Sequence, residues 1–196
     1  SPVIDLAERL IELAPVAMKR VYFVNSGSEA NDTAIKMLWM LNKGAGKPDK
    51  RKIISRKSAY HGTTVASCSL NGKPYINCFG LPLKEILYAD CPHYWRDGLP
   101  GESEEDYAGR LADNLEALIQ AEGADTIAGF IAEPVMGAGG ALVPPKGYFE
   151  KIEAVLRRHD IAIISDEVVC GFGRTGSMWG CETYNFRPDI ICTSKC

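Results

Sequence analysis

Two short apolar segments near the end of the chain are each followed by a reactive side chain. Residues 161–165 read Ile-Ala-Ile-Ile-Ser and precede Asp166, whereas residues 190–191 are both isoleucine and stand shortly before Lys195. Apolar runs of this length are typical of buried strands. The carboxyl ends of strands in an open parallel sheet line the ligand crevice, so the sequence predicts that a carboxylate and an amine meet there.

The remaining sequence alternates between helical and strand-like patterns. Apolar residues recur at helical spacing over 4–13, over a segment from Ser28 to Gly44, over 103–121 and over 145–159. Apolar runs at 21–24, 52–55, 86–88 and 127–132 are strand-like. We expect 71–101 to be mostly ordered loop. Strands that alternate with helices predict an α/β fold, a mostly parallel doubly wound sheet with helices on both faces in three αβα layers.

Composition excludes several classes of protein. The chain has 196 residues and a net charge of −3, so we expect no nucleic-acid partner. No apolar run reaches the roughly 20 residues of a membrane span, and the first residues do not read as a signal peptide. The cysteines number seven and none forms a C-x-x-C pair, which predicts no zinc or other metal site and favours a reduced, cytoplasmic setting.

The predicted pairing of Asp166 with Lys195 suits one cofactor in particular. A lysine forms a Schiff base with an aldehyde, and a carboxylate keeps a basic ring nitrogen protonated, which are the two contacts that pyridoxal phosphate (PLP) needs. Taken singly, each residue has an ordinary interpretation. Asp166 could be a solvated acid in a turn, and Lys195 could be a surface lysine at the end of a strand.

Several short motifs resemble the class III, or omega, aminotransferases, a branch of the fold-type I PLP enzymes. They are Asn25-Ser-Gly-Ser-Glu-Ala-Asn31, Tyr60-His-Gly62, Ala132-Glu-Pro134, Asp166-Glu-Val168 with Gly171-Phe-Gly-Arg-Thr-Gly176, and Ser194-Lys195. Each motif is weak alone, but together they stand in the family's order. The family's chains are about twice as long, so we interpret residues 1–196 as part of the large PLP-binding domain.

The resemblance assigns a role to individual residues. Lys195 and Asp166 are expected to be catalytic and to bind the cofactor. Gly27 and Ser28 are expected to hold the cofactor phosphate, although an ordinary helix cap would have the same sequence. Tyr60 is expected to cover one face of the ring.

Three further positions in these motifs are less constrained. Val168 is expected against the ring face opposite Tyr60. Glu133 is expected near the cofactor, with an exposed acid at a strand end as the alternative. Glu167 is interpreted as structural, and no role is assigned to His61.

The implied activity is transfer of an amino group from an omega-amino acid or amine to an oxo acid. Val169 stands where glutamate-using relatives often have glutamine, which favours pyruvate as the acceptor. An aminomutase, decarboxylase or racemase on the same scaffold, or a non-catalytic PLP-fold module, remain alternatives. We expect small-molecule donor and acceptor, no membrane association, and a homodimer or homotetramer.

Overall fold

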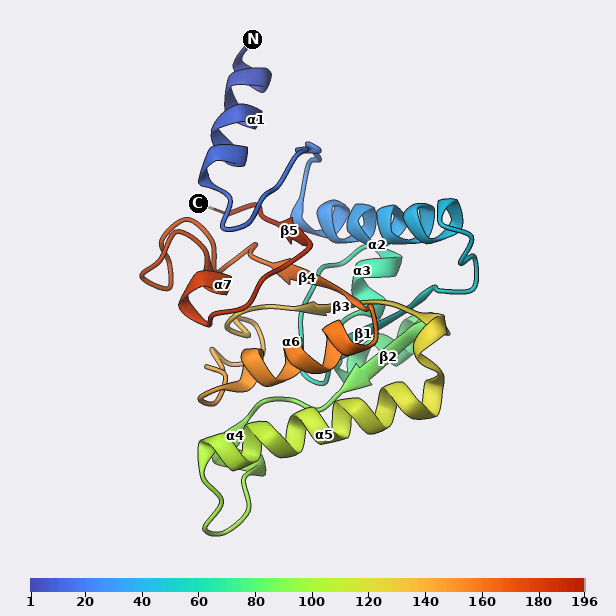
Figure 1. The fold of residues 1–196 in the computed structure, drawn as a ribbon, viewed down its shortest axis with the longest axis vertical. Helices are drawn as coiled ribbons and strands as arrows, with labels where there is room; N and C mark the ends of the chain where they lie inside the picture. Colours follow the sequence, from blue (N-terminus) through green and yellow to red (C-terminus); the bar gives the residue numbers. More distant parts are fainter. Residues whose placement is uncertain (196) are drawn as a thin grey trace.

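Five short strands form one sheet, and neighbouring strands all run parallel in the order β2-β1-β3-β4-β5 (Figure 1). The structure is a computed structural model that describes residues 1–195. The strands are β1 (Lys52–Arg56), β2 (Ile86–Ala89), β3 (Ile127–Ala132), β4 (Ala162–Asp166) and β5 (Ile190–Cys192). The predicted parallel sheet is therefore confirmed, and each of these strands lies within a residue or two of its predicted position.

Helices cover both faces of the sheet. Helices α2 (Gly27–Gly44) and α3 (Val65–Ser69) lie on one face, and α5 (Glu104–Glu122) and α6 (Tyr148–Arg158) lie on the other (Figure 1). The shorter helical elements are α4 (Tyr94–Asp97), α7 (Gly180–Thr183) and the 3-10 helices η1 (Pro74–Phe79) and η2 (Ala124–Thr126). This arrangement is the predicted three-layer α/β fold.

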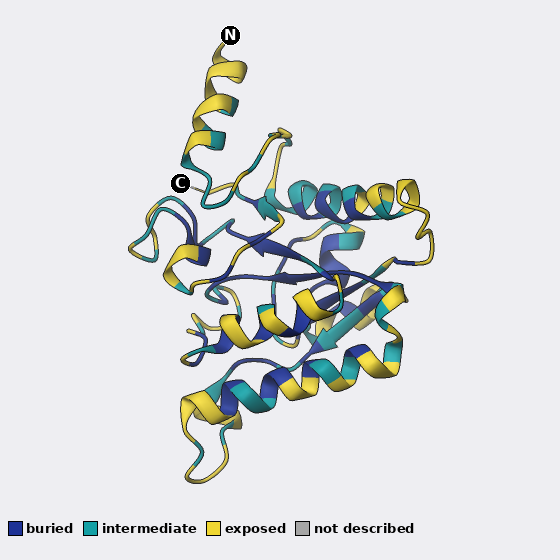
Figure 2. Ribbon diagram, in the orientation of Figure 1, coloured by how far each residue is buried: buried dark blue, intermediate teal, exposed yellow. Residues whose placement is uncertain are grey.

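The sheet is buried on both sides, which explains its continuous apolar sequences. Ile53 packs in the cluster that includes Leu38 of α2, whereas the next residue, Ile54, packs with Leu115 of α5. Successive side chains of a strand point to opposite faces, so both need apolar residues when both faces are covered. Figure 2 shows the central strands β1, β3 and β4 mainly in the colour of buried residues, the edge strands β2 and β5 partly in the intermediate colour, and the outer faces of the helices exposed.

Local capping chemistry sets the helix ends. The hydroxyl of Ser26 accepts a hydrogen bond from Glu29 N at 3.2 Å, and that of Ser103 accepts from Asp106 N at 3.1 Å. Gly123, with φ 83°, ends α5 as predicted. The helix predicted to begin at 145 begins instead at Tyr148, because Gly147 adopts a left-handed φ of 75° just before it.

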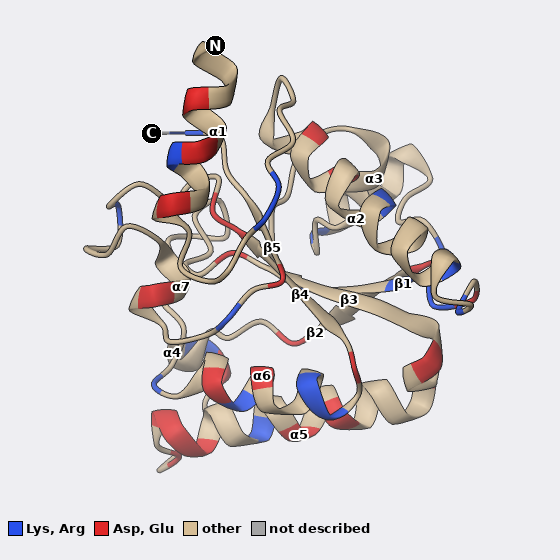
Figure 3. Ribbon diagram, turned by 45° about the horizontal axis from the view of Figure 1, so that its top comes forward, with Lys and Arg blue, Asp and Glu red and all other residues tan. Residues whose placement is uncertain are grey.

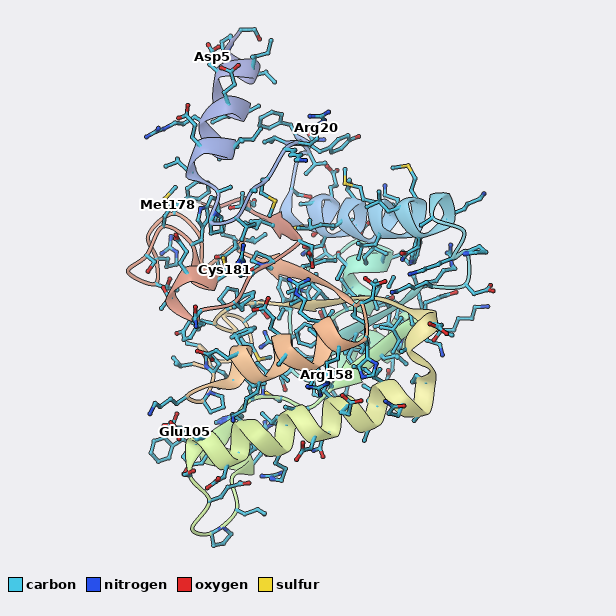
Figure 4. All side chains as sticks on the ribbon, in the orientation of Figure 1. Asp5, Arg20, Glu105, Arg158, Met178 and Cys181 are labelled. Carbon is cyan, nitrogen blue, oxygen red and sulfur yellow. The ribbon has the colours of Figure 1, made fainter. Side chains whose placement is uncertain are left out.

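The first residues form a helix that stands apart from the sheet. Helix α1 (Pro2–Leu13) has no buried residue, and Figure 4 places Asp5 and Arg20 away from the strands. The indole nitrogen of Trp179 donates to Leu13 O at 2.6 Å and fixes the end of this helix. The prediction of a helix at 4–13 is thus confirmed, although its apolar stripe is not part of the core.

The strand predicted at 21–24 is wrong. These residues lack strand structure, and Tyr22 and Phe23 are 67% and 46% exposed. A short apolar run becomes a strand only when a neighbouring strand supplies hydrogen bonds, and none of the strands within residues 1–195 pairs with this segment. Leu41, predicted in the apolar stripe of α2, is also exposed, because it lies beyond the part of the helix that packs on the sheet.

The surface carries charges of both signs. Figure 3 shows acidic and basic residues interspersed along α5 and α6. Among the described residues no helix has the length and apolar character needed to cross a bilayer. Residues 1–195 contain no cluster of three or more His, Cys, Asp or Glu side chains arranged to hold a metal ion.

The strand order locates the ligand crevice. In a sheet of order 2-1-3-4-5 the connections leave in opposite directions at the boundary between β1 and β3. Ligands of such sheets bind outside the carboxyl ends of the strands at this switch point. The loops that follow β1, β3 and β4 are therefore the segments to search for a site.

Candidate functional site

Segments that are far apart in the sequence meet at the carboxyl end of the sheet. Asp166 is the last residue of β4, and Glu133 directly follows β3. Tyr60 and His61 lie in the loop after β1, and Asn31 comes from the first turns of α2. Hydrogen bonds between these residues, described below, join the segments into one cluster.

Asp166 is the centre of the cluster. Its Oδ2 accepts from Asn31 Nδ2 at 2.9 Å and lies 2.7 Å from His61 Nδ1. Its Oδ1 accepts from the main-chain N–H of Val168 at 3.1 Å. The residue is only 3% exposed. A buried carboxylate is stabilised by such donors, so the solvated-acid interpretation of Asp166 does not hold.

The start of α2 presents unpaired donors to the same region. The main-chain N–H groups of Gly27 and Ser28 make no hydrogen bond within the described residues, as expected for the first turn of a helix. The hydroxyl oxygen of Ser28 accepts from Thr63 N at 3.1 Å, which leaves its proton available to donate. Free N–H groups and the positive end of the helix dipole favour an anion such as a phosphate.

Two glycines allow the close approach of these segments. A Cβ at Gly27 would lie 2.8 Å from Val168 Cγ2, and a Cβ at Gly62 would lie 2.4 Å from the hydroxyls of both Ser28 and Ser67. Gly62 also has a φ of 138°, which side-chain-bearing residues rarely adopt. Both positions therefore need glycine, and both contacts involve a predicted cofactor-binding residue.

Both carboxylate oxygens of Glu133 accept hydrogen bonds from main-chain N–H groups. Its Oε1 accepts from Tyr60 N at 3.1 Å and its Oε2 from Gly137 N at 3.0 Å, and the residue is 4% exposed. Its own carbonyl oxygen accepts from Nη2 of the buried Arg56 at 2.6 Å. The exposed-acid alternative is excluded, and Glu133 fixes the main chain on which Tyr60 is carried.

Lys195 lies beside the residues that follow β4. Its main-chain N–H donates to the carbonyl oxygen of Val168 at 3.3 Å, and its side chain is exposed. Val168 is half-buried and is two residues from Asp166. The structure thus brings the predicted catalytic pair to neighbouring strand ends.

Two buried polar residues of the cluster had no predicted role. Asn31 donates from Nδ2 both to Asp166 and, at 2.8 Å, to the carbonyl oxygen of His61. It lies one turn before Ala34 and Ile35 on the covered face of α2, and a polar residue on an apolar helical face was the available signal. For His61 the sequence offered no comparable signal, because its environment is formed entirely by distant segments.

Glu167 is structural, as predicted. The residue is buried, and its carboxylate accepts from the main-chain N–H groups of Gly180 and Cys181 at 2.8 Å each, at the start of α7. Burial raises the pKa of this carboxyl, although these hydrogen bonds oppose the shift. Glu167 therefore anchors α7 to the end of β4.

Comparison with known proteins places this arrangement in a family. The family model described as "Aminotransferase class-III" matches residues 1–196. A rice protein (Oryza sativa subsp. indica) named "Probable gamma-aminobutyrate transaminase 2, mitochondrial" is 55% identical over 196 residues, which cover 99% of this chain and 39% of that protein. The chain thus spans about two fifths of the length of this relative.

Solved structures agree in both fold and sequence. A structure described as "Transaminase with L-ala" superimposes with a TM-score of 0.98 at 58% identity, over 100% of this chain and 46% of that chain. A PLP-bound aminotransferase mutant from Vibrio fluvialis gives a TM-score of 0.95 at 59% identity, over 98% of this chain and 42% of that chain. The first of these superpositions covers the whole chain, and therefore every strand of the sheet and every helix that packs on it.

Proposed function

The chain belongs to the class III aminotransferases, and on that premise we propose that the full-length protein is a PLP-dependent transaminase. It transfers an amino group from an omega-amino acid or amine to an oxo acid. The observation that carries the proposal is the cluster at the carboxyl end of the sheet, where the buried Asp166 carboxylate stands beside the strand end that leads to Lys195. The names of the relatives favour a transaminase over an aminomutase, decarboxylase or racemase.

The donor set fits PLP. The unpaired N–H groups of Gly27 and Ser28 suit its phosphate, and the hydroxyl proton of Ser28 can add a further hydrogen bond. Asp166 has one acceptor position left on Oδ1 for a protonated ring nitrogen, since its other contacts occupy three of the about four lone-pair sites of a carboxylate. Tyr60 and Val168 are proposed to contact the two faces of the ring. When bound, PLP supplies an aldehyde and an electron-accepting ring.

The proposed roles of the chain's own residues follow from their chemistry. Lys195 would hold the cofactor through its amine, and the same amine would act as the base that moves a proton to and from the substrate carbon. Asp166 holds the proton on the ring nitrogen. Glu133 supports the site indirectly, by fixing the main chain at Tyr60 and Gly137.

We propose pyruvate as the amino acceptor. Val169 is half-buried, and a Cβ at Gly137 would lie 3.5 Å from its Cγ1, so an apolar side chain lines the loop beside Glu133. An apolar position suits a small acceptor that needs no second carboxylate contact. The structural relative described with L-ala supports this choice, because alanine is the amine that corresponds to pyruvate. The relatives named gamma-aminobutyrate transaminases support an omega-amino acid as the donor.

Location and assembly remain predictions. A homodimer or homotetramer is expected from the family resemblance. The cytoplasmic location predicted from composition contrasts with the rice relative, whose name places it in mitochondria.

Chemical trapping tests the proposed function. We expect borohydride reduction of the full-length protein with bound PLP to leave a stable adduct on the peptide that contains Lys195, located by mass spectrometry. Lys195→Ala should abolish both the adduct and turnover. Lys36→Ala is the matched control, because Lys36 is an exposed lysine on α2 and should change neither. An adduct on another lysine, or normal turnover of Lys195→Ala, would contradict the proposal.

Half-reaction kinetics test the acceptor. Starting from the aminated form of the full-length enzyme, pyruvate should restore the starting absorbance with a larger kcat/KM than 2-oxoglutarate. The opposite order would show that the acceptor is wrong and would leave the transaminase proposal intact.

A further inference from the structure

Asp32 lies on α2 one turn after Ser28, and its carboxylate reaches the neighbouring helix α3. Side chains four positions apart lie on the same face of a helix, so Ser28 and Asp32 share a face of α2. Asp32 Oδ1 accepts from Ser67 N and from the hydroxyl of Thr64, each at 2.8 Å. Figure 1 shows α3 beside α2 on the same face of the sheet. The carboxylate therefore ties the start of one helix to the side of the other.

This carboxylate replaces the ordinary cap of α3. Thr64 is the N-cap residue of α3, yet its own side chain makes no capping hydrogen bond. An N-cap hydroxyl commonly accepts from the N–H of the third helical residue, which here is Ser67 and donates to Asp32 instead. The Thr64 hydroxyl gives its proton to the same carboxylate oxygen. The start of α3 is thus fixed by a residue of α2.

The residue before Thr64 determines where the Ser28 hydroxyl can donate. Thr63 N donates to Ser28 Oγ at 3.1 Å. A main-chain N–H can only donate, and a hydroxyl has one proton and two lone pairs, so this contact uses a lone pair and leaves the proton of Ser28 for another acceptor. The loop has little room to shift, because a Cβ at Gly62 would lie 2.4 Å from the hydroxyls of both Ser28 and Ser67.

We propose that Asp32 is a positioning residue for the cofactor phosphate: by capping α3 from α2 it holds the Thr63 N–H on Ser28, so that the Ser28 proton is directed to the phosphate. The proposal rests on the proposed function, in which Gly27 and Ser28 hold the phosphate of PLP. Without the carboxylate, the loop 62–64 loses one of its attachments to α2. The Ser28 hydroxyl is then less restricted, and ordering it on binding costs more of the binding free energy.

A comparison of two ligands separates positioning from a purely structural role. PLP and pyridoxal share the ring and the aldehyde, and only PLP has the phosphate. A residue that acts through the phosphate contact changes the affinity for PLP and leaves that for pyridoxal as it was, whereas a general loss of structure weakens both. The dissociation constants of both ligands and the melting temperature are measured for each variant of the full-length protein.

Four substitutions define the contact. Asp32→Ala removes the acceptor, and Asp32→Asn keeps an oxygen that can take the place of Oδ1. Thr64→Val has nearly the same shape and removes one of the two donors that Asp32 holds, so it tests the same contact if Asp32→Ala does not fold. Ser103→Ala is the matched control. The Ser103 hydroxyl also caps the third residue of a helix, accepting from Asp106 N at 3.1 Å, but does so at the start of α5 on the opposite face of the sheet.

The expected losses follow from the hydrogen bond to the phosphate. Loss of a hydrogen bond to a charged group weakens binding by about 10- to 100-fold. We expect Ser28→Ala to lower PLP affinity within this range and Asp32→Ala, which only misorients the same donor, to lower it by about 10-fold. Asp32→Asn should recover most of the loss, and Thr64→Val should show a smaller loss. Pyridoxal affinity should stay constant throughout, and Ser103→Ala should lower only the melting temperature.

A double variant tests whether Asp32 acts through Ser28. In a Ser28→Ala background, Asp32→Ala should cause no further loss of PLP affinity, because the donor that it positions is already absent. Additive losses would overturn the inference, as would equal losses for PLP and pyridoxal. Unchanged PLP affinity in Asp32→Ala, or in Thr64→Val where Asp32→Ala does not fold, would overturn it too, as would a failure of Asp32→Asn to recover affinity at a normal melting temperature.

The reference variant Ser28→Ala separates this inference from the proposed function. If Ser28→Ala weakens PLP binding selectively and Asp32→Ala does not, only the positioning role of Asp32 fails. If Ser28→Ala leaves PLP affinity unchanged, the assigned phosphate contact is wrong and the inference fails with it, whereas the proposed function is judged separately by the adduct on Lys195. If the unsubstituted protein binds neither ligand, the proposed function fails.

Discussion

Replacement of Gly27 by alanine tests the close packing between the start of α2 and the segment after β4. An ideal Cβ at this position would lie 2.8 Å from Val168 Cγ2 and 3.1 Å from Val168 Cγ1. The first distance is well below the about 3.5–4.0 Å at which carbon atoms attract each other. Gly27 does not have a positive φ, so the steric conflict is confined to the Val168 side chain and includes no backbone strain.

The magnitude follows from two opposing effects. Overpacking of a well-packed site typically costs about 1–3 kcal/mol. Alanine in place of glycine gains up to about 1 kcal/mol in a helix, and less at its first position. We therefore expect Gly27→Ala to lower the free energy of unfolding by about 1–2 kcal/mol, the difference between these effects. Because the clash displaces the first turn of α2, the affinity for PLP should fall as well.

A double-mutant cycle identifies the contact responsible. Val168→Ala alone removes two half-buried carbons and should cost about 1 kcal/mol. It also removes the atoms that a Cβ at Gly27 would meet, so the double variant should be more stable than the sum of the single effects predicts, by about 1–2 kcal/mol. Distant substitutions would instead be additive within a few tenths of a kcal/mol.

Denaturant unfolding of the full-length protein, followed by tryptophan fluorescence, measures the free energy of unfolding of each variant. Gly109→Ala is the control, because Gly109 lies in α5 and a Cβ there would meet nothing within 4 Å. It should be neutral or stabilising. If Gly27→Ala is as well tolerated as Gly109→Ala, or if the two single effects simply add in the double variant, the packing argument is refuted.

Three further substitutions or labelling experiments test other parts of the structure. Gly62→Ala should be more damaging than Gly27→Ala, with a loss of about 3 kcal/mol or more, because a φ of 138° adds strain to the contacts at 2.4 Å; a well-folded variant with normal PLP affinity would contradict this. Burial raises the pKa of Cys170 to about 11, so mass spectrometry after a pulse of iodoacetamide at pH 8 should find Cys78, which is exposed, labelled before Cys170; equal labelling of the folded protein would refute the assigned burial. The pKa of Glu167 is raised by burial, so the folded protein binds this proton before the unfolded chain does, and the stability that it contributes grows as pH falls through the folded-state pKa towards the ordinary value of 4.5. Glu167→Gln should remove this component from the pH dependence of the melting temperature, and an unchanged pH dependence would count against it.

Local sequence patterns were sufficient for most of the fold. The apolar run at 127–132 is β3 residue for residue, and the helix predicted from Ser103 to about 121 is α5, capped by Ser103 and ended by Gly123. These elements were predictable because the capping residue, the helix-breaking glycine and the periodic apolar residues all lie within one short segment of the sequence. The failure at 21–24 has the opposite cause, since a strand depends on a neighbour that its own residues cannot supply.

The residues of the candidate site also fall into those that the sequence indicated and those that only the structure revealed. Asp166 and Glu133 could be found from sequence because each ends or directly follows an apolar run, and parallel strands deliver such residues to one edge. The side chains that contact Asp166 could not be identified from the sequence. Nothing in the residues that neighbour His61 or Asn31 in the sequence indicates that both side chains contact the Asp166 carboxylate, because the three residues come from a loop, a helix and a strand.

The sequence by itself determined the five strands of the sheet and its longer helices, the burial of the sheet on both faces and the residue types that reach its carboxyl end. These features follow from the periodic spacing of apolar residues, from capping residues and from the positions of glycines, all of which act over a few neighbouring residues. Only the tertiary structure decided which donors surround Asp166, that Glu133 is committed to the main chain at Tyr60 and Gly137, and that Gly27 and Val168 leave no space between them. The physical reason is that hydrogen bonds and steric contacts between distant segments depend on distances of a few tenths of an ångström, which are set by how the whole sheet and its helices pack.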